Sequence, residues 1–220
     1  ADLVRAGLPA DRVTAIPNGV DTERFAPAPV EEAKRRLGLP VERCVVGMVG
    51  RLNAVKRFDM VLRVLPRIQN RCGSIHLVVV GDGEERHRLE RIAEEAGCAE
   101  RVSFLGYRSR MEEVYPALAL LIHPSLSEGM SNVILEAMAC GVPVVASDIP
   151  ANREVVADGE TGMLFRAGDA QDLCGKVAEL LAAVGQRQRM GQRARQQVVQ
   201  RFRFEAMVEG YRRVYRNFLG

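Results

Sequence analysis

The sequence lacks the motifs that mark several common classes of enzyme. No cysteine–histidine set has the spacing of a zinc site, no serine lies in a GxSxG elbow, and there is no Walker A pattern. Gly81-Asp82-Gly83 follows an apolar run, as a dinucleotide-binding loop does, but Arg86 stands at the position of the third glycine. We therefore expect no metal site, and the hydrolase, NAD and P-loop ATP interpretations lose their main support.

Charge and hydropathy also exclude several kinds of partner. The net charge is +3, with acidic and basic residues mixed along the chain, a bias too weak to predict nucleic-acid binding. No apolar run reaches the ~18 residues that a membrane-spanning helix needs. The start, ADLVRAGLPADR, is not a signal peptide and lacks methionine, so we expect a fragment or a processed protein. Basic residues gather between Arg187 and Arg203, either as a solvated helix face or as a surface for a membrane or an acidic partner.

The cysteines form no CxxC pair, and several lie in apolar surroundings. Buried free thiols are the expected state of such residues. They fit a reducing compartment, so we expect a cytoplasmic protein. The cysteines are Cys44, Cys72, Cys98, Cys140 and Cys174.

Short apolar runs alternate with amphipathic stretches along most of the chain. The runs are rich in Val, Ile and Leu, as strands buried on both faces are. They predict strands at Cys44–Val49, Ile75–Val80, Val102–Leu105, Leu120–His123, Pro143–Ser147 and Gly162–Phe165. The other stretches predict helices at Val30–Leu37, Phe58–Arg71, Glu84–Ala96, Met111–Leu118, Ser131–Cys140, Ala170–Val184, Gln186–Gln200 and Phe204–Phe218. This alternation predicts an α/β fold with a doubly wound, Rossmann-like parallel sheet in three α/β/α layers.

Sheets of this kind bind ligands at the carboxyl ends of their strands, near the point where the strand order reverses. Five loops that follow predicted strands hold the residues with unusual chemistry. We expect them to share one crevice: Gly50–Lys56, Gly81–Glu84, Gly106–Arg108, Pro124–Ser131 and Ser147–Arg153.

The segment SLSEGMSNVILE, which begins at Ser125, has the features of a phosphate site. Ser131 is a good N-cap, and a helix N-terminus offers free N–H groups and a positive partial charge to an anion. Gly129 permits close approach of the backbone. Glu128 can accept hydrogen bonds from hydroxyl groups, and the carboxylate of Glu136 suits a vicinal diol such as ribose. The alternative from spacing alone is that Glu128 caps the helix and Glu136 is solvated.

Basic and aromatic side chains follow two other predicted strands. Arg51 directly follows one strand and Lys56 lies a short loop later, and two cations at a strand end match a dianionic diphosphate. After another strand, the backbone near Gly106 can read a base edge and Tyr107 can pack on it. The alternatives are two surface bases in the first loop and an ordinary connection in the second.

Taken together, these motifs resemble the retaining glycosyltransferases of family 4, which have the GT-B fold. SLSEGMSNVILEAMACGVPVVASD resembles the donor-binding motif of that family, in which two glutamates separated by seven residues match Glu128 and Glu136. IPNGVDTERF resembles the start of the family's second domain. VGRLNAVKRFD resembles its diphosphate-binding loop, with Arg57 where a glycine usually follows the lysine. VVVGDGEER, VSFLGY and EVVADGETGMLF also fit, so the resemblance covers nearly the whole chain.

The resemblance implies a role for each site residue. The catalytic set would be Arg51 and Lys56, which hold the diphosphate of the donor, and Glu128, which contacts the transferred sugar and helps to stabilise charge at its anomeric carbon. Glu136 would bind the ribose. The remaining binding residues would be Tyr107 and Arg108 near the base, and the backbone amides of Gly129, Met130, Ser131 and Asn132. Catalysis would need no metal and no cofactor, because fixed charges would stabilise the leaving nucleotide.

The resemblance also divides the chain. Residues 1–40 would form an interdomain linker, 41–203 a nucleotide-sugar-binding domain, and 204–220 a helix that crosses back to an acceptor-binding domain upstream. The predicted function is donor binding in a hexosyltransferase that uses a UDP- or GDP-sugar, with the fragment alone inactive in transfer. A peripheral membrane contact of the full enzyme stays open, since many acceptors of the family are lipid-linked. The alternatives are a stand-alone nucleotide-sugar-binding or interaction module without transferase activity, and a GT-B epimerase.

Overall fold

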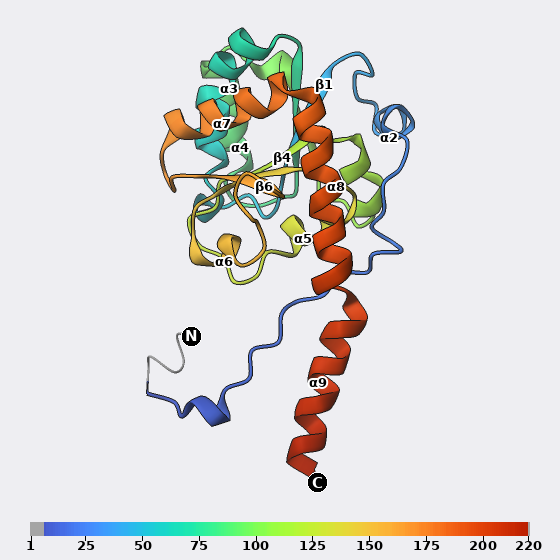
Figure 1. The fold of residues 1–220 in the computed structure, drawn as a ribbon. Coiled ribbons are helices and arrows are strands. Elements are labelled where there is room, and N and C mark those ends of the chain that lie inside the picture. The colour runs from blue at the N-terminus through green and yellow to red at the C-terminus, as the bar shows by residue number, and fades with distance from the viewer. Residues whose placement is uncertain (1–6, 220) are drawn as a thin grey trace.

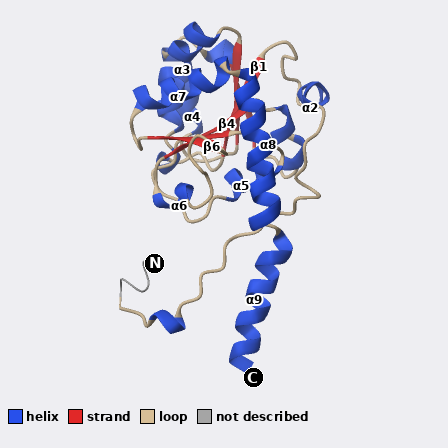
Figure 2. Ribbon diagram, viewed as in Figure 1, coloured by secondary structure: helices blue, strands red, loops and turns tan. Residues whose placement is uncertain are grey.

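In the computed structural model, which describes residues 7–219, six parallel strands form one sheet between layers of helices (Figures 1 and 2). The strands are β1 (Cys44–Val49), β2 (Ile75–Val80), β3 (Val102–Gly106), β4 (Leu120–His123), β5 (Val144–Ser147) and β6 (Gly162–Phe165). Their spatial order is β3-β2-β1-β4-β5-β6, which reverses between β1 and β4. The predicted doubly wound α/β fold is therefore confirmed.

Helices cover both faces of the sheet. The α-helices are α2 (Val30–Arg36), α3 (Phe58–Cys72), α4 (Arg86–Glu95), α5 (Asn132–Ala139), α6 (Pro150–Arg153), α7 (Ala170–Ala182), α8 (Val184–Arg201) and α9 (Phe204–Leu219). The 3-10 turns are η1 (Ala10–Arg12), η2 (Ala54–Lys56), η3 (Ala99–Arg101), η4 (Met111–Glu113) and η5 (Tyr115–Ala117). One hydrophobic cluster joins α3, α4 and α7 to the sheet, and a second joins α2, α5 and most of the buried face of α8 to the opposite face.

The continuous apolar runs in the sequence follow from this double coverage. In β1, Val46 and Met48 pack into the cluster with α3, whereas Val45 and Val49 pack into the cluster with α5. All four side chains are buried. A strand with helices on both faces has no polar side, so the alternation typical of a half-exposed strand is absent.

Two predictions of secondary structure were wrong, and proline explains both. The helix expected over Met111–Leu118 is replaced by η4 and η5, because Pro116 would remove an N–H and clash with the preceding turn in the interior of a helix. Part of the loop expected over Ser147–Arg153 forms the one-turn helix α6. Pro150 begins that helix, where its missing N–H has no intrahelical partner to lose.

The N-terminal segment, which was predicted to be an interdomain linker over residues 1–40 and is called the linker below, returns to the end of α8 and the start of α9. The amide of Val20 donates to the carbonyl of Phe202 (2.8 Å), and the amide of Phe204 donates to the carbonyl of Val20 (3.1 Å). Gly19 lies directly against this junction, because a Cβ there would be 2.7 Å from the carbonyl oxygen of Arg203. The two segments therefore leave the body of the domain at one point.

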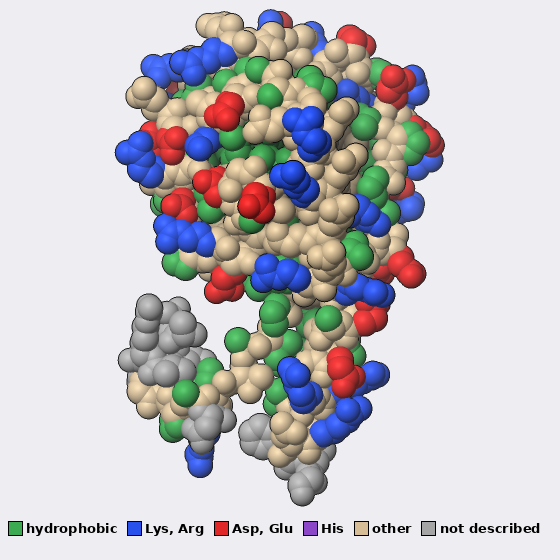
Figure 3. All heavy atoms as spheres, viewed as in Figure 1, with side chains coloured by type: hydrophobic (Ala, Val, Ile, Leu, Met, Phe, Trp, Pro, Cys, Tyr) green, Lys and Arg blue, Asp and Glu red, His purple; other side chains and the backbone are tan. Residues whose placement is uncertain are grey.

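Beyond this junction, α9 and the linker project away from the sheet (Figures 1 and 3). The two stay in contact, since a Cβ at Gly210 would lie 2.9 Å from Cγ2 of Ile16. Apolar rings on α9 remain open to solvent: Tyr211 is 50% exposed and Tyr215 is 65% exposed.

The cysteines are free, as expected. Three thiols are buried, and the other two, Cys44 and Cys72, are half-buried. Burial raises the pKa of the Cys140 thiol to about 12, so this group stays protonated. Within residues 7–219, no helix combines the length and the apolar character needed to cross a membrane.

The basic stretch on α8 is only partly a solvated face. The guanidinium of Arg195 donates from Nη1 to the carbonyl of Phe25 (3.1 Å) and to that of Ala139, and from Nη2 to the carbonyl of Thr22 (3.4 Å). Arg195 therefore ties the linker segment and the end of α5 to α8.

We expect Arg195→Met to lower the free energy of unfolding by about 2 kcal/mol, because a half-buried set of carbonyl groups would lose its charged donor. Arg193→Met on the same helix is the control. Arg193 is exposed and makes no hydrogen bond in the described structure, so its replacement should change stability by less than about 0.5 kcal/mol. Urea denaturation followed by circular dichroism measures both. Equal stability of the two variants would show that the guanidinium contacts contribute nothing.

Candidate functional site

A cavity of about 400 Å³ opens at the carboxyl ends of β1, β2 and β3, beside the N-terminal half of α5. Arg51 follows β1, Asp82 follows β2, Tyr107 and Arg108 follow β3, and Glu136 reaches the cavity from α5. The fold thus brings four of the predicted site residues to one cavity, namely Arg51, Tyr107, Arg108 and Glu136. Tyr107 is 77% exposed, so its ring is accessible to a ligand.

The floor of this cavity is formed by backbone packed on backbone. A Cβ at Gly81 would lie 1.9 Å from the carbonyl oxygen of Gly50, and Gly81 has a φ of +133°. The amide of Gly81 donates to the carbonyl of Gly106 (2.9 Å). Only glycine satisfies both the close approach and the dihedral angle, so Gly81 is needed for the packing of this loop against the loop after β1.

Glu136 lies half-buried at the wall of the cavity. The hydroxyl of Tyr115 donates to its Oε2 (2.7 Å). Burial raises the pKa of Glu136, and the hydrogen bond from Tyr115 partly opposes this effect. Burial and the neighbouring carboxylate raise the pKa of Tyr115 well above its ordinary value, so the phenol remains a donor. Glu136 is therefore not a solvated helix residue, which was the alternative from spacing alone. Its other oxygen, Oε1, receives no hydrogen bond from the described residues.

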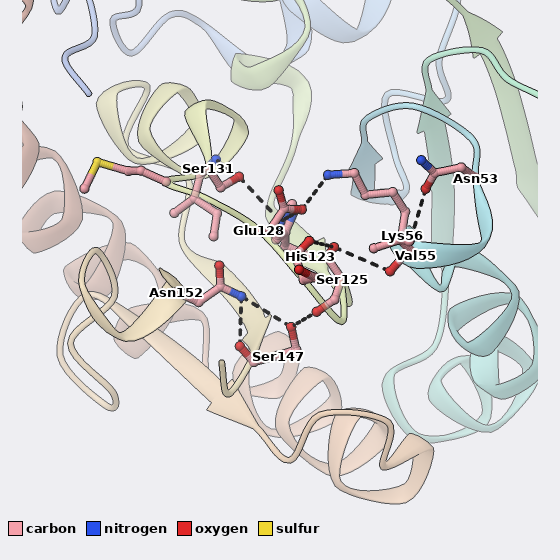
Figure 4. Close-up of polar contacts among 12 residues, drawn as sticks. Asn53, Val55, Lys56, His123, Ser125, Glu128, Ser131, Ser147 and Asn152 are labelled. Atoms are coloured by element: carbon pink, nitrogen blue, oxygen red, sulfur yellow. Dashed lines mark hydrogen bonds and ion pairs between the residues drawn. The ribbon is translucent and has the colours of Figure 1, made fainter. Parts of the chain in front are cut away.

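Lys56 and Glu128 lie next to the cavity and pair with each other. The ammonium of Lys56 contacts Oε1 of Glu128, and both side chains are mostly buried (Figure 4). Nε2 of His123 lies 3.0 Å from the same oxygen. Burial alone would raise the pKa of Glu128, but the contacts with His123 and Lys56 outweigh it and lower the pKa to about 2. Glu128 is thus an anion at any physiological pH.

The Lys56–Glu128 pair joins the cavity at Gly50. A Cβ at Gly50 would be 3.6 Å from Cε of Lys56, and Gly50 itself lines the cavity. Arg51 stands at the rim, where its side chain is 73% exposed and Nη2 is 3.7 Å from the Glu84 carboxylate. An exposed pair at that distance is weak, so Arg51 is available to an anionic ligand.

The residue after Lys56 shows local strain. Among residues 7–219, Arg57 is the one non-glycine residue in the left-handed region, with a φ of 52°. This conformation costs a side-chain-bearing residue about 1 kcal/mol relative to glycine. This cost explains why glycine usually follows the lysine in the glycosyltransferase family that the sequence resembles.

The N-terminus of α5 is capped by Ser131 and not by Glu128. The hydroxyl of Ser131 accepts from the amide of Ile134 (3.4 Å). The amides of Asn132 and Val133 have no partner inside the helix and remain available to a ligand. In the loop before this helix, no atom lies within 4 Å of the Cβ position of Gly129, so the space beside Gly129 is open.

Buried polar contacts hold the loop after β4 in place (Figure 4). The amide of Leu126 donates to the carbonyl of Val55 (3.0 Å), which joins this loop to the one that carries Lys56. On the other side, the hydroxyl of Ser147 donates to the carbonyl of Ser125, and the side-chain Nδ2 of Asn152 donates to the carbonyl of Ser147 (2.8 Å). All five predicted loops therefore meet at this edge of the sheet, three around the cavity and two beside it.

Three residues at the site were not identified as site residues from the sequence. Asn18 of the linker donates from Nδ2 to the carbonyl of Met130 (3.2 Å) and to Oδ1 of Asn132 (3.0 Å). His123 is the last residue of the predicted strand Leu120–His123, and this position at a strand end is the feature of the sequence that could have identified it. No sequence feature identified Tyr115 as a site residue, because it lies in the segment that was predicted to be a helix. No three His, Cys, Asp or Glu side chains gather as a metal site in the part of the chain that the structure describes.

Comparisons with known proteins agree with this architecture. The model of the family described as "Glycosyl transferases group 1" matches residues 29–197. A D-inositol 3-phosphate glycosyltransferase of Stackebrandtia nassauensis is 38% identical over 200 residues, which are 86% of this chain and 45% of that protein. The chain spans about half the length of the curated relatives it matches.

Solved structures give the same result. The sucrose-phosphate synthase of Thermosynechococcus elongatus is 28% identical with a TM-score of 0.90, over 99% of this chain and 56% of that one. Anabaena HepE in complex with UDP-glucose is 27% identical with a TM-score of 0.86, over 98% of this chain and 59% of that one. These similarities confirm the resemblance to the carboxyl-terminal half of GT-B enzymes. Because the family model matches more than half of its residues, this chain belongs to the glycosyl transferases group 1 family.

Proposed function

We propose that these 220 residues bind the nucleotide-sugar donor of a retaining glycosyltransferase. The observation that best supports this function is the convergence of complementary groups on one strand-end cavity. An exposed cation that is only weakly paired, Arg51, and a half-buried carboxylate, Glu136, line the cavity, and the Lys56–Glu128 pair adjoins it. A phosphate, a ribose and a sugar would each find a matching partner within this group.

In this proposal, Arg51, Lys56 and the amides at the start of α5 hold the diphosphate. Their charges and dipoles are fixed before the reaction, so they stabilise the leaving nucleotide without a metal ion. Glu128 accepts hydrogen bonds from the sugar and stabilises positive charge at the anomeric carbon. Glu136 binds the ribose diol through its free Oε1, and Tyr107 and Arg108 contact the base.

The donor in this proposal is a UDP- or GDP-sugar. Similarity to Anabaena HepE, whose structure contains UDP-glucose, favours uridine. We propose that transfer also requires an acceptor-binding domain outside these residues, since the chain spans about half the length of its curated relatives. We also propose that the protein works in a reducing cytoplasm, which would keep its five cysteines as free thiols.

Isothermal titration of the folded chain should detect binding of UDP or GDP with a Kd between about 1 μM and 1 mM. Uridine, which lacks the diphosphate, should bind at least about tenfold more weakly, because it forgoes the charge-assisted contacts. Adding EDTA should leave the UDP affinity unchanged. If a sample with native circular dichroism binds none of UDP, GDP and ADP, the proposed function is wrong.

The ribose contact can be isolated with Glu136→Gln. We expect UDP to bind this variant about tenfold more weakly, and 2′,3′-dideoxy-UDP to bind it almost as it binds the wild type, because the removed charge serves the missing hydroxyls. Glu94→Gln, on the exposed face of α4, should affect neither ligand. The same loss of affinity for both nucleotides in Glu136→Gln would place this carboxylate away from the ribose.

A further inference from the structure

His123 occupies a fixed position behind the Glu128 carboxylate. It ends β4, which lies inside the sheet between β1 and β5, and its side chain is fully buried. Nε2 of His123 and Nζ of Lys56 both contact Oε1 of Glu128 (Figure 4). Both nitrogens contact Oε1, which leaves Oε2 without a nitrogen donor from the described residues.

The two partners of Glu128 differ once a donor binds. The proposed function gives Lys56 to the diphosphate, which would draw the ammonium away and bring negative charge toward the carboxylate. Like charge opposes ionisation of a carboxyl group. The other polar groups near Glu128 are the hydroxyl of Ser125 and, through His123, that of Ser131 at 3.4 Å from Nε2. Of the nitrogen donors that contact the carboxylate, His123 is the one that stays in place.

The surroundings of the His123 imidazole also indicate which of its two ring nitrogens carries the proton. Nδ1 of His123 is buried and has no hydrogen-bond partner in the described structure. A proton on Nδ1 would be a buried donor without an acceptor, which is costly, and would leave the lone pair of Nε2 facing an anion. Of the two neutral tautomers, the one with the proton on Nε2 therefore fits, and it donates to Glu128.

We propose that His123 is a positioning residue that keeps the Glu128 carboxylate oriented toward the donor sugar when the diphosphate draws Lys56 away. This inference rests on the function proposed above. It separates two tasks: Lys56 recognises the anion, whereas His123 fixes the carboxylate from a strand that does not move with the loop. Oε2 of Glu128, which has no nitrogen donor in the described structure, can then accept from a sugar hydroxyl.

Two amide variants test this assignment because they place their donors differently. Glutamine can set its amide nitrogen close to the position of Nε2, whereas asparagine reaches only the position of Nδ1. The measured quantity is the ratio of the Kd for a free nucleotide to the Kd for its sugar derivative. A panel of UDP-glucose, UDP-N-acetylglucosamine and GDP-mannose selects the tightest sugar for the wild-type chain, and Glu128→Gln gives the ratio without the carboxylate.

We expect His123→Asn to lower this ratio about tenfold, as loss of a hydrogen bond to a charged group does. His123→Gln should keep most of the wild-type ratio.

The decrease of the ratio in His123→Asn should depend on pH. Without the His123 donor, burial moves the pKa of Glu128 upward, so the ionised fraction falls as the pH is lowered. Between about pH 5 and pH 8, the ratio for His123→Asn should be smallest at the acidic end. Because free UDP itself titrates near about pH 6, each variant is compared with the wild type at the same pH.

His76 supplies a matched control. It is also a buried strand histidine, its Nε2 contacts the hydroxyl of Ser103 at 2.8 Å, and its Nδ1 has no partner in the described structure. His76 lies near the start of β2, at the opposite end of the strands from the cavity. His76→Asn should leave the sugar ratio as in the wild type, which separates positioning from a general effect on folding.

The outcomes distinguish this inference from the proposed function. Wild-type binding with sugar discrimination, together with an unchanged ratio in His123→Asn, would overturn the role of His123 and leave the proposed function intact. Absence of nucleotide binding by the wild type would overturn both. If the His123 variants do not fold, ¹⁵N NMR of the histidine rings in the wild type decides: we expect the Nε2–H tautomer of His123 with and without UDP, and the Nδ1–H tautomer would contradict the proposal.

Discussion

The register between β1 and β2 is the constraint on which the site depends. The two strands pair along their whole length, from Cys44 opposite Ile75 to Val49 opposite Val80, so they end level with each other. Gly50 and Gly81 then meet directly, with their backbones in contact. A slip of one residue would exchange the two faces of a strand. It would also bring a side chain to the point where only glycine fits, and the cavity floor would not form.

Electrostatic compensation is the second requirement of the site. Glu128 is a mostly buried anion, and without partners its charge would be costly. Lys56 from the neighbouring loop supplies the opposite charge, and Nε2 of His123, at the end of β4, contacts the same carboxylate oxygen. In the proposed function, a ligand anion competes with Glu128 for Lys56. The contacts that fix the loop itself, such as Leu126 to Val55, use the backbone and need no change of charge.

The regular alternation of strands and helices is the part of the structure that the sequence predicted best. Val/Ile/Leu runs located all six strands to within a residue or two, and the strand-end rule placed Arg51, Tyr107 and Arg108 near one another. The sequence was least informative where a contact joins distant segments. The pairing of Glu128 with Lys56, the hydroxyl of Tyr115 on Glu136 and the reach of Asn18 to α5 depend on side-chain geometry that spacing does not contain. Pro116 and Pro150 mark, in the sequence itself, the two places where the secondary structure differs from the prediction.

The junction between the linker and α9 is also connected to the loop before α5. Val20 and Arg203 pair as a short parallel bridge, and Gly19 fits against the backbone there without room for a side chain. Asn18, two residues earlier, holds the loop at the start of α5. Three consecutive residues, Asn18 to Val20, therefore connect the start of α9 to the loop before α5 through direct contacts at both ends.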